Sequence, residues 1–160
     1  MYGKDLLTRQ ERVEVRRDYT SERLIKPTNI KKAKSLGYLA IQGVVVIRGK
    51  IRKGSFRKPS LKATGRKPSK RGIKKITLSL RSREIIERRI SKKYPNLVIL
   101  GSYWMEESGQ HKWYEIIFVD PQHPSIRNRQ KYKSLIESPG VMSRQFRGAT
   151  SAGKKSKSSK

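Results

Sequence analysis

The sequence predicts an α+β fold: a small antiparallel sheet with a helix packed on one face, carrying a long basic loop and basic terminal extensions. The order of the expected elements is strand, long basic segment, helix, strand, strand, which packs most simply in that way. Only 34% of the 160 residues are hydrophobic, and most of these residues fall within the expected core elements. We therefore expect one modest domain with appendages.

The N-terminal residues 1–26 mix charges of both signs around scattered apolar residues, so we expect an extension that is helical in places. A short basic helix follows over residues 30–36. Thr28 or Asn29 is its expected cap, and Gly37 stands where a helix usually ends.

The β-branched run over residues 43–47 is typical of a strand. Basic residues alternate with other types over residues 48–53, and we expect this far end to leave the core. Residues 54–72 contain too little apolar surface to offset an ordering entropy of about 1–2 kcal/mol per residue, so we expect them to be disordered in the free protein.

A second helix is expected to begin at Ser82, its predicted cap, and to end at Pro95. The strands over residues 97–105 and 112–119 are joined by a polar link containing Gly109, which predicts a hairpin. The shared core consists of the following residues or their alternates along the strands, because residues 116–119 are apolar on both faces: Val44, Val46, Ile86, Ile90, Val98, Leu100, Ile116 and Phe118.

The C-terminal part contains a possible short helix over residues 125–136, and from residue 138 onward we expect no autonomous structure. This gives three expected segments. They are an N-terminal extension with the short basic helix (1–37), an α+β core containing the basic loop 48–76 (38–126), and a C-terminal basic tail (127–160).

Charge is the strongest functional signal. Residues 23–83 contain no aspartate or glutamate but hold 20 of the 40 lysines and arginines, and the net charge is +28. Such a segment favours a polyanionic partner, and nucleic acid fits better than a membrane because no apolar run approaches the roughly 20 residues of a spanning helix. We expect a protein inside the cell, with no signal peptide. The absence of cysteine excludes disulfides and zinc knuckles.

The residues expected to contact RNA share a positive charge and lie in the short helix, the basic loop or the tail. They are Lys31, Lys32, Lys34, Arg48, Lys50, Arg52, Lys53, Arg57, Lys58, Lys62, Arg66, Lys67, Lys70, Arg71, Lys74, Lys75, Arg144, Arg147, Lys154, Lys155 and Lys157.

Aromatic residues leave two interpretations open. Phe56 in the loop is either a base-stacking residue or a local hydrophobic anchor. Along the hairpin, Tyr103 and Trp104 point to opposite faces, as do Trp113 and Tyr114, so at least one of each pair belongs to the core. Packing is favoured over base stacking for these residues.

A catalytic interpretation would gather six residues into a metal-dependent nuclease site: Glu106, Glu107, His111, Glu115, Asp120 and His123. Their spacing matches no known metal motif, and the sequence contains no phosphate loop or nucleophile elbow. We therefore expect no enzyme activity, no metal, no cofactor and no small-molecule substrate.

Several motifs resemble one family. The segments GSYW at 101–104, KWYEIIFVDPQHPSIR at 112–127 and RGATSAGK at 147–154 are similar to the large-subunit ribosomal protein "L fifteen e" family of archaea and eukaryotes. Earlier markers, namely Pro27-Thr28, LGY at 36–38 and Gln42-Gly43, follow the family's order. The likeness runs from Pro27 to the tail, about four fifths of the chain.

This resemblance implies a core similar to that of ribosomal protein "L twenty-three" and a structural role in the cytoplasmic ribosome. The implied partners are large-subunit rRNA and neighbouring large-subunit proteins. Leu39 and Ile41 stand where the family is expected to have lysines, so phosphate contacts are not carried over there. The family usually extends further at both ends, and contacts made through those parts are not carried over either. The alternative from another class is a free-standing DNA-compacting or regulatory protein, which explains the charge but not the motifs.

Overall fold

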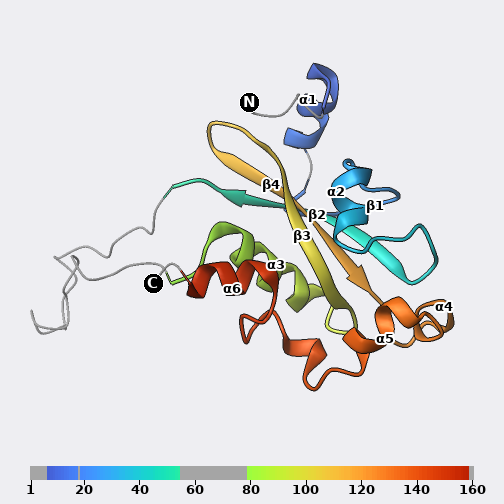
Figure 1. The fold of residues 1–160 in the computed structure, drawn as a ribbon. Coiled ribbons are helices and arrows are strands. Elements are labelled where there is room, and N and C mark those ends of the chain that lie inside the picture. Colours follow the sequence, from blue (N-terminus) through green and yellow to red (C-terminus); the bar gives the residue numbers. More distant parts are fainter. Residues whose placement is uncertain (1–6, 18, 55–78, 159–160) are drawn as a thin grey trace, which may run out of the picture.

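A four-stranded antiparallel sheet forms the centre of the protein, with strands in the order β1-β2-β4-β3 (Figure 1). The computed structural model describes residues 7–17, 19–54 and 79–158. The strands are β1 (Ser21–Leu24), β2 (Val44–Arg52), β3 (Val98–Glu107) and β4 (His111–Val119). The α+β class with an antiparallel sheet is therefore confirmed.

The strand pairing explains why β4 is buried along most of its length. β4 pairs with β2 through all nine residues of both strands and with β3 on its other side. The β3 pairing shifts register twice, between Ile99 and Gly101 and between Trp104 and Glu106. Each shift is a bulge, which bends and twists this edge strand.

Helix α3 (Ser82–Lys93) covers one face of the sheet. Ile86 and Ile90 contribute the apolar stripe that the sequence predicts, and they pack with Ile47, Ile116 and other sheet residues in one buried cluster. Gly49 allows this close approach, since a Cβ there would lie 2.5 Å from Ile90. The helix begins differently from our expectation, because Arg81 and not Ser82 is the N-cap and no side chain caps the helix.

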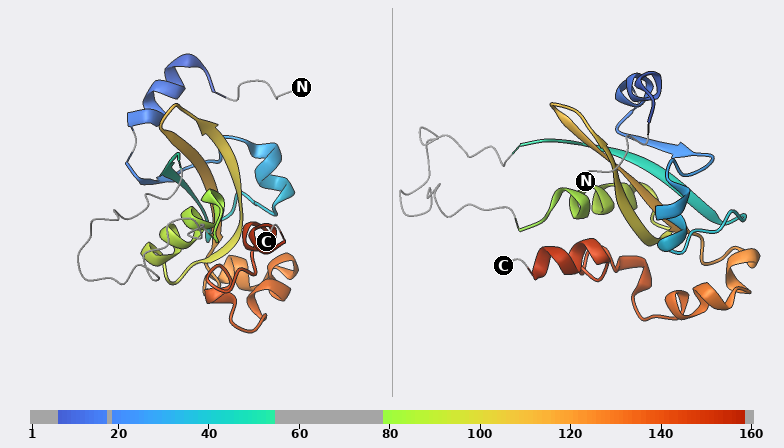
Figure 2. Two further views of the ribbon diagram at one scale, coloured as in Figure 1. Left: turned by 90° about the vertical axis from the view of Figure 1, so that its left-hand side faces the viewer. Right: turned by 45° about the horizontal axis from the view of Figure 1, so that its top comes forward.

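The opposite face is covered as well (Figure 2, left). Helix α2 (Ile30–Ser35) buries Ala33 with Tyr103 and Ile117. Helix α1 (Arg9–Arg17) contributes Val15 to a separate cluster on the hairpin. Because both faces of the sheet are covered, β4 carries apolar residues on both of its sides. Most of the predicted core is buried, with Val44 and Leu100 only partly buried.

The N-terminal extension holds more structure than expected. The helical part is confirmed as α1, but β1 was not foreseen, and it pairs antiparallel with β2 from Ser21 opposite Gly49 to Leu24 opposite Val46. Strand β2 runs to Arg52, so the segment expected to leave the core remains paired in the sheet. Its partner β4 provides the continuous ladder that keeps it there.

The chain beyond β4 wraps one end of the sheet and then returns. Two short helices, α4 (Pro124–Arg127) and α5 (Gln130–Ile136), replace the single predicted one. A 3-10 turn (Val141–Ser143) and helix α6 (Ser151–Lys157) follow, and α6 lies beside α3 (Figure 2, right).

The expectation of no autonomous structure after residue 138 is therefore wrong. Thr150 caps α6 by accepting a hydrogen bond from the Gly153 N–H, and Ala152 is buried. A basic composition does not prevent this helix from forming, because a cap and one buried side are enough when the helix packs on an existing core.

Candidate nucleic-acid interface

Helix α2 presents three lysines to solvent. The Asn29 side chain accepts a hydrogen bond from the Lys32 N–H and so fixes where the helix begins, as predicted. Ala33 is completely buried against the sheet, so its neighbours along the helix must point outward. Lys31, Lys32 and Lys34 are exposed. The solvent-facing side of α2 is therefore positively charged.

Trp104 lies next to this charged surface. Its side chain is 43% exposed, whereas Tyr103, Trp113 and Tyr114 are buried. The Lys32 Nζ lies 6.0 Å from the centre of the Trp104 ring, within range of a cation–π interaction. The prediction that at least one aromatic of each pair belongs to the core is confirmed. Three of the four residues are packed in the protein interior and are not available for base stacking.

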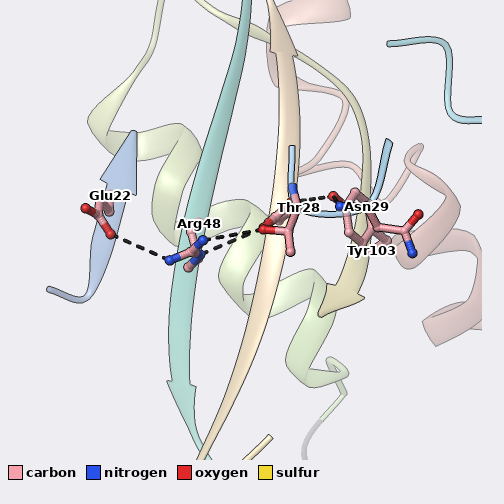
Figure 3. Close-up of polar contacts among 6 residues, drawn as sticks. Glu22, Thr28, Asn29, Arg48 and Tyr103 are labelled. Carbon is pink, nitrogen blue, oxygen red and sulfur yellow. Dashed lines mark hydrogen bonds and ion pairs between the residues drawn. The ribbon is translucent and has the colours of Figure 1, made fainter. Parts of the chain in front are cut away.

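Arg48 differs from the lysines of α2 because its guanidinium faces the protein (Figure 3). Its side chain is 14% exposed, and its nitrogens lie 3.8 Å from the Glu115 carboxylate and 3.9 Å from that of Glu22. Arg48 also donates a hydrogen bond to the Thr28 hydroxyl. Its positive charge predicts an RNA contact for this residue, whereas the structure gives it internal partners.

Glu115 is the centre of that internal network. Although it is completely buried, its carboxylate accepts hydrogen bonds from the Thr28 N–H at 3.0 Å, from the Thr28 hydroxyl and from the Tyr103 hydroxyl. The Tyr103 oxygen in turn accepts from the Asn29 N–H. Burial, and then the nearby Glu115 charge, raise the pKa of Tyr103. This network attaches the segment before α2 to the sheet.

Three further predicted cations lie at the end of β2. Lys50 is partly buried and Arg52 is exposed. The Lys53 Nζ lies 3.0 Å from the Glu107 carboxylate of the hairpin. The remaining loop predictions fall outside the described residues: Arg57, Lys58, Lys62, Arg66, Lys67, Lys70, Arg71, Lys74 and Lys75. The open interpretation of Phe56 falls outside them too.

Helix α3 turns its acids inward and three of its cations outward. Glu84 and Glu87 are buried, and the Glu84 carboxylate lies 2.6 Å from the Arg88 guanidinium. Glu87 accepts hydrogen bonds from the Ser102 hydroxyl of β3 and from the Thr150 hydroxyl at 2.7 Å. The outward positions of the helix are basic, namely Arg89, Lys92 and Lys93.

The tail cations divide into two groups. Arg144 donates a hydrogen bond to the Ile99 carbonyl at 3.0 Å, and burial lowers its pKa. Arg147 donates to the Gly140 carbonyl at 2.7 Å, so it stabilises the turn that precedes α6. In contrast, Lys154 and Lys155 are exposed on α6. Lys157 is also exposed, and its Nζ donates to the Arg147 carbonyl at 2.9 Å.

One basic hollow was missed by sequence reasoning. It has a volume of about 330 Å³ and lies between the start of α3, β4 and α6, where its charged lining is Arg81, Arg83, Lys112 and Lys155. Arg81 and Arg83 end the acid-free run, but nothing in the sequence pairs them with Lys112, about thirty residues away. The packing of α3 on β4 and of α6 beside α3 brings these residues together.

The residues considered for a nuclease do not form a metal site. Within ranges 7–17, 19–54 and 79–158, no three histidine, aspartate or glutamate side chains gather where they could hold a metal ion. Glu115 is occupied by its hydrogen bonds, and Glu107 lies near Lys53 and Lys112. In the same ranges, no helix has both the length and the apolar content to span a bilayer.

The fold and these surfaces define a class, a strongly basic α+β protein that buries glutamates in its core and exposes lysines and arginines on its helices. The family model described as "Ribosomal L15" matches residues 3–160. The chain belongs to this family, which is the family that its motifs resemble, and the family consists of structural proteins of the large ribosomal subunit. The match includes the N-terminal residues, where the sequence analysis found little likeness.

Proposed function

We propose that this protein binds and stabilises folded large-subunit rRNA as a structural constituent of the ribosome and so supports translation. The ribosomal part rests on membership of the family. The RNA-binding part rests on one observation, the direction of the charges on α3. Glu84 and Glu87 point into the core while Arg89, Lys92 and Lys93 face outward. Solubility alone favours a surface of mixed sign, so a basic outer surface favours a polyanionic partner.

The mechanism is neutralisation of phosphate charge combined with shape complementarity. The outward lysines of α2 and α6 act as mobile point charges, whereas arginines can bind phosphates with two parallel hydrogen bonds. The predicted loop residues between 48 and 76 add the largest block of charge. Neighbouring large-subunit proteins complete the site in the cytoplasmic ribosome, and no step of this mechanism requires catalysis.

Joint replacement of the loop lysines by serine tests the RNA contact. The variant changes Lys58, Lys62, Lys67, Lys70, Lys74 and Lys75. We expect weaker incorporation into large subunits and, for the purified protein with rRNA, a salt dependence of log Kd that is smaller by about one unit for each phosphate that the variant no longer neutralises. The control replaces the neutral residues Gln10, Gln122 and Gln130 by serine and leaves both unchanged. Unchanged incorporation of the lysine variant would show that the loop does not bind RNA.

The alternative is a free-standing DNA-binding protein, which the net charge of +28 also allows. Sedimentation of cell extracts at moderate salt separates the two functions. We expect the protein in a stoichiometric amount in the large-subunit peak. Enrichment on DNA and absence from that peak would support the alternative.

A further inference from the structure

An apolar pocket ringed by lysines lies beside α2. It has a volume of about 370 Å³. The apolar part of its lining comes from Pro27, Ile30, Tyr38, Leu39 and Ala40. The charged part consists of Lys26, Lys34 and Lys131, and no carboxylate is among the lining residues.

The pocket is built from three segments that the fold holds firmly together. These are the chain before α2, the turn after α2, and α5. The Tyr132 hydroxyl donates a hydrogen bond of 2.9 Å to the Gly37 carbonyl and so joins α5 to that turn. Gly37 itself has φ +99°, a left-handed conformation that few other residues adopt. The pocket is therefore formed before any partner arrives.

Tyr38 gives the pocket an aromatic wall. One side of this residue packs against the buried cluster of Ala33, Tyr103 and Ile117, and the residue also lines the pocket. Ile30 of α2, which is 49% exposed, lines the pocket too. A flat apolar group that entered the pocket would meet an aromatic side chain that packing already holds in place.

The charge of the rim selects the partner. Three lysines and no acid around an apolar cavity repel a cationic protein segment and attract phosphate groups. An unstacked nucleotide has the matching chemistry, a flat base between two phosphates. RNA-binding proteins recognise such bases by stacking them on aromatic side chains.

We propose that this pocket binds one flipped-out base of single-stranded RNA, with the base against Tyr38 and the flanking phosphates on Lys26, Lys34 and Lys131. This inference rests on the proposed function and deepens it. The basic loop and tail follow phosphates, whereas this pocket adds recognition of a base. A duplex segment does not satisfy it, because paired bases are stacked within the helix.

Binding of a short oligoadenylate to the full-length protein tests the base contact. The comparison ligand is a fully abasic RNA of the same length, in which no base can enter the pocket, and dissociation constants are measured over a range of salt concentrations. We expect the abasic RNA to bind about tenfold more weakly to the wild-type protein, with the same salt dependence for both RNAs. Equal affinities would overturn the inference and leave the electrostatic binding of the proposed function intact.

Two variants locate the effect in the pocket. Tyr38→Ala removes the aromatic wall, and Ala40→Leu fills the cavity from an exposed position that does not affect the core. Both should bind the two RNAs equally, whereas Tyr38→Phe should keep the tenfold difference. If Tyr38→Ala unfolds, Ala40→Leu alone decides. A tenfold difference that persists in Ala40→Leu would place the base elsewhere and overturn the inference.

Photocrosslinking in assembled subunits distinguishes RNA from protein as the occupant. A benzophenone amino acid at position 130, which is exposed beside the pocket residue Lys131 and leaves the cavity open, should form an adduct with rRNA in purified large subunits. An adduct with a neighbouring protein instead would overturn the inference but not the proposed function. Absence of the chain from the large subunits would overturn the proposed function, whereas the oligoadenylate measurement tests the pocket independently.

Discussion

Two buried glutamates on opposite faces of the sheet hold opposite ends of the chain. Glu115 binds the segment before α2, and Glu87 binds Thr150 at the start of α6. Glu115 has Arg48 at 3.8 Å, and without Glu115 the Arg48 guanidinium would keep the more exposed Glu22 at 3.9 Å and the Thr28 hydroxyl. Glu87 has Arg83 at 3.9 Å. Arg83 also donates to Ser102, which would remain as its partner without Glu87. The two carboxylates differ in what they accept: Glu115 accepts hydrogen bonds from the Thr28 N–H, the Thr28 hydroxyl and the Tyr103 hydroxyl, whereas Glu87 accepts from the Ser102 and Thr150 hydroxyls. The N-terminal attachment therefore depends more strongly on its carboxylate than the C-terminal one does.

The largest expected effect is that of Glu115→Ala. This change removes the buried acid beside Arg48, which keeps the more exposed Glu22, and it removes the acceptor of the Thr28 N–H, the Thr28 hydroxyl and the Tyr103 hydroxyl. We therefore expect the free energy of unfolding to fall by about 3–5 kcal/mol. Urea denaturation followed by circular dichroism measures it. Faster amide exchange should appear in α2 before α6. A decrease of less than about 1 kcal/mol would contradict the central role of Glu115.

Glu87→Ala should cost less, about 2–3 kcal/mol, since the two hydroxyls that lose their acceptor are neutral and Arg83 keeps Ser102. The same urea denaturation measures the decrease. Amide exchange should now rise in α6 and leave α2 unchanged. An effect as large as that of Glu115→Ala would remove the distinction between the two faces.

Thr150→Val removes the Thr150 hydroxyl and leaves the Glu87 carboxylate in place, so it measures the contribution of the hydroxyl alone. It removes the cap of α6 and one hydrogen bond to Glu87, for an expected decrease of about 1–2 kcal/mol in the free energy of unfolding. Thermal unfolding of this variant is compared with Ser151→Ala, at the exposed neighbouring position, which should change stability little. Equal effects of the two changes would mean that Thr150 does not hold the tail.

Tyr103→Phe gives the smallest effect, and its signature is the pH dependence. The pKa of Tyr103 is raised by burial, so the folded protein keeps this proton at a pH where the unfolded chain, with a tyrosine pKa near 10, loses it. The stability that this proton contributes is complete below about pH 10 and is lost as pH rises above it.

The free energy of unfolding of Tyr103→Phe should therefore fall less steeply with pH above about pH 10 than that of the wild type. The difference in slope should be about 1.4 kcal/mol per pH unit, which corresponds to one proton. Urea denaturation between about pH 9 and pH 11 measures the slope. Tyr19→Phe, at a position that is 88% exposed, provides the control and should follow the wild type. Parallel curves for Tyr103→Phe and wild type would show that Tyr103 ionises normally in the folded protein.

Local signals in the sequence predicted the local structure. The asparagine before α2, the polar link between the two strands of the hairpin and the Ile86 and Ile90 stripe each act within a few residues, and each was confirmed. The family followed from motifs of the same kind. These features need no knowledge of the rest of the chain.

What the sequence could not show depends on distant contacts. β1 is a strand because Glu22 and Arg23 lie beside β2, and no alternating apolar pattern marks it. α6 is held by a carboxylate 63 residues away. Arg48 has the same type of neighbours as Arg52 in the sequence, yet only Arg48 lies on the sheet opposite Glu115. The pocket beside α2 likewise requires α5, which follows almost one hundred residues later.

The two edges of the sheet have a consequence for the protein before it meets its partner. Exposed strand edges are templates for association between chains. One edge here is β1, only four residues long with Glu22 and Arg23 at its centre. The other is β3, whose ladder is interrupted by two bulges. Short, charged or bulged edges of this kind resist edge-to-edge pairing, so a newly made copy of this protein should resist aggregation while it waits for assembly.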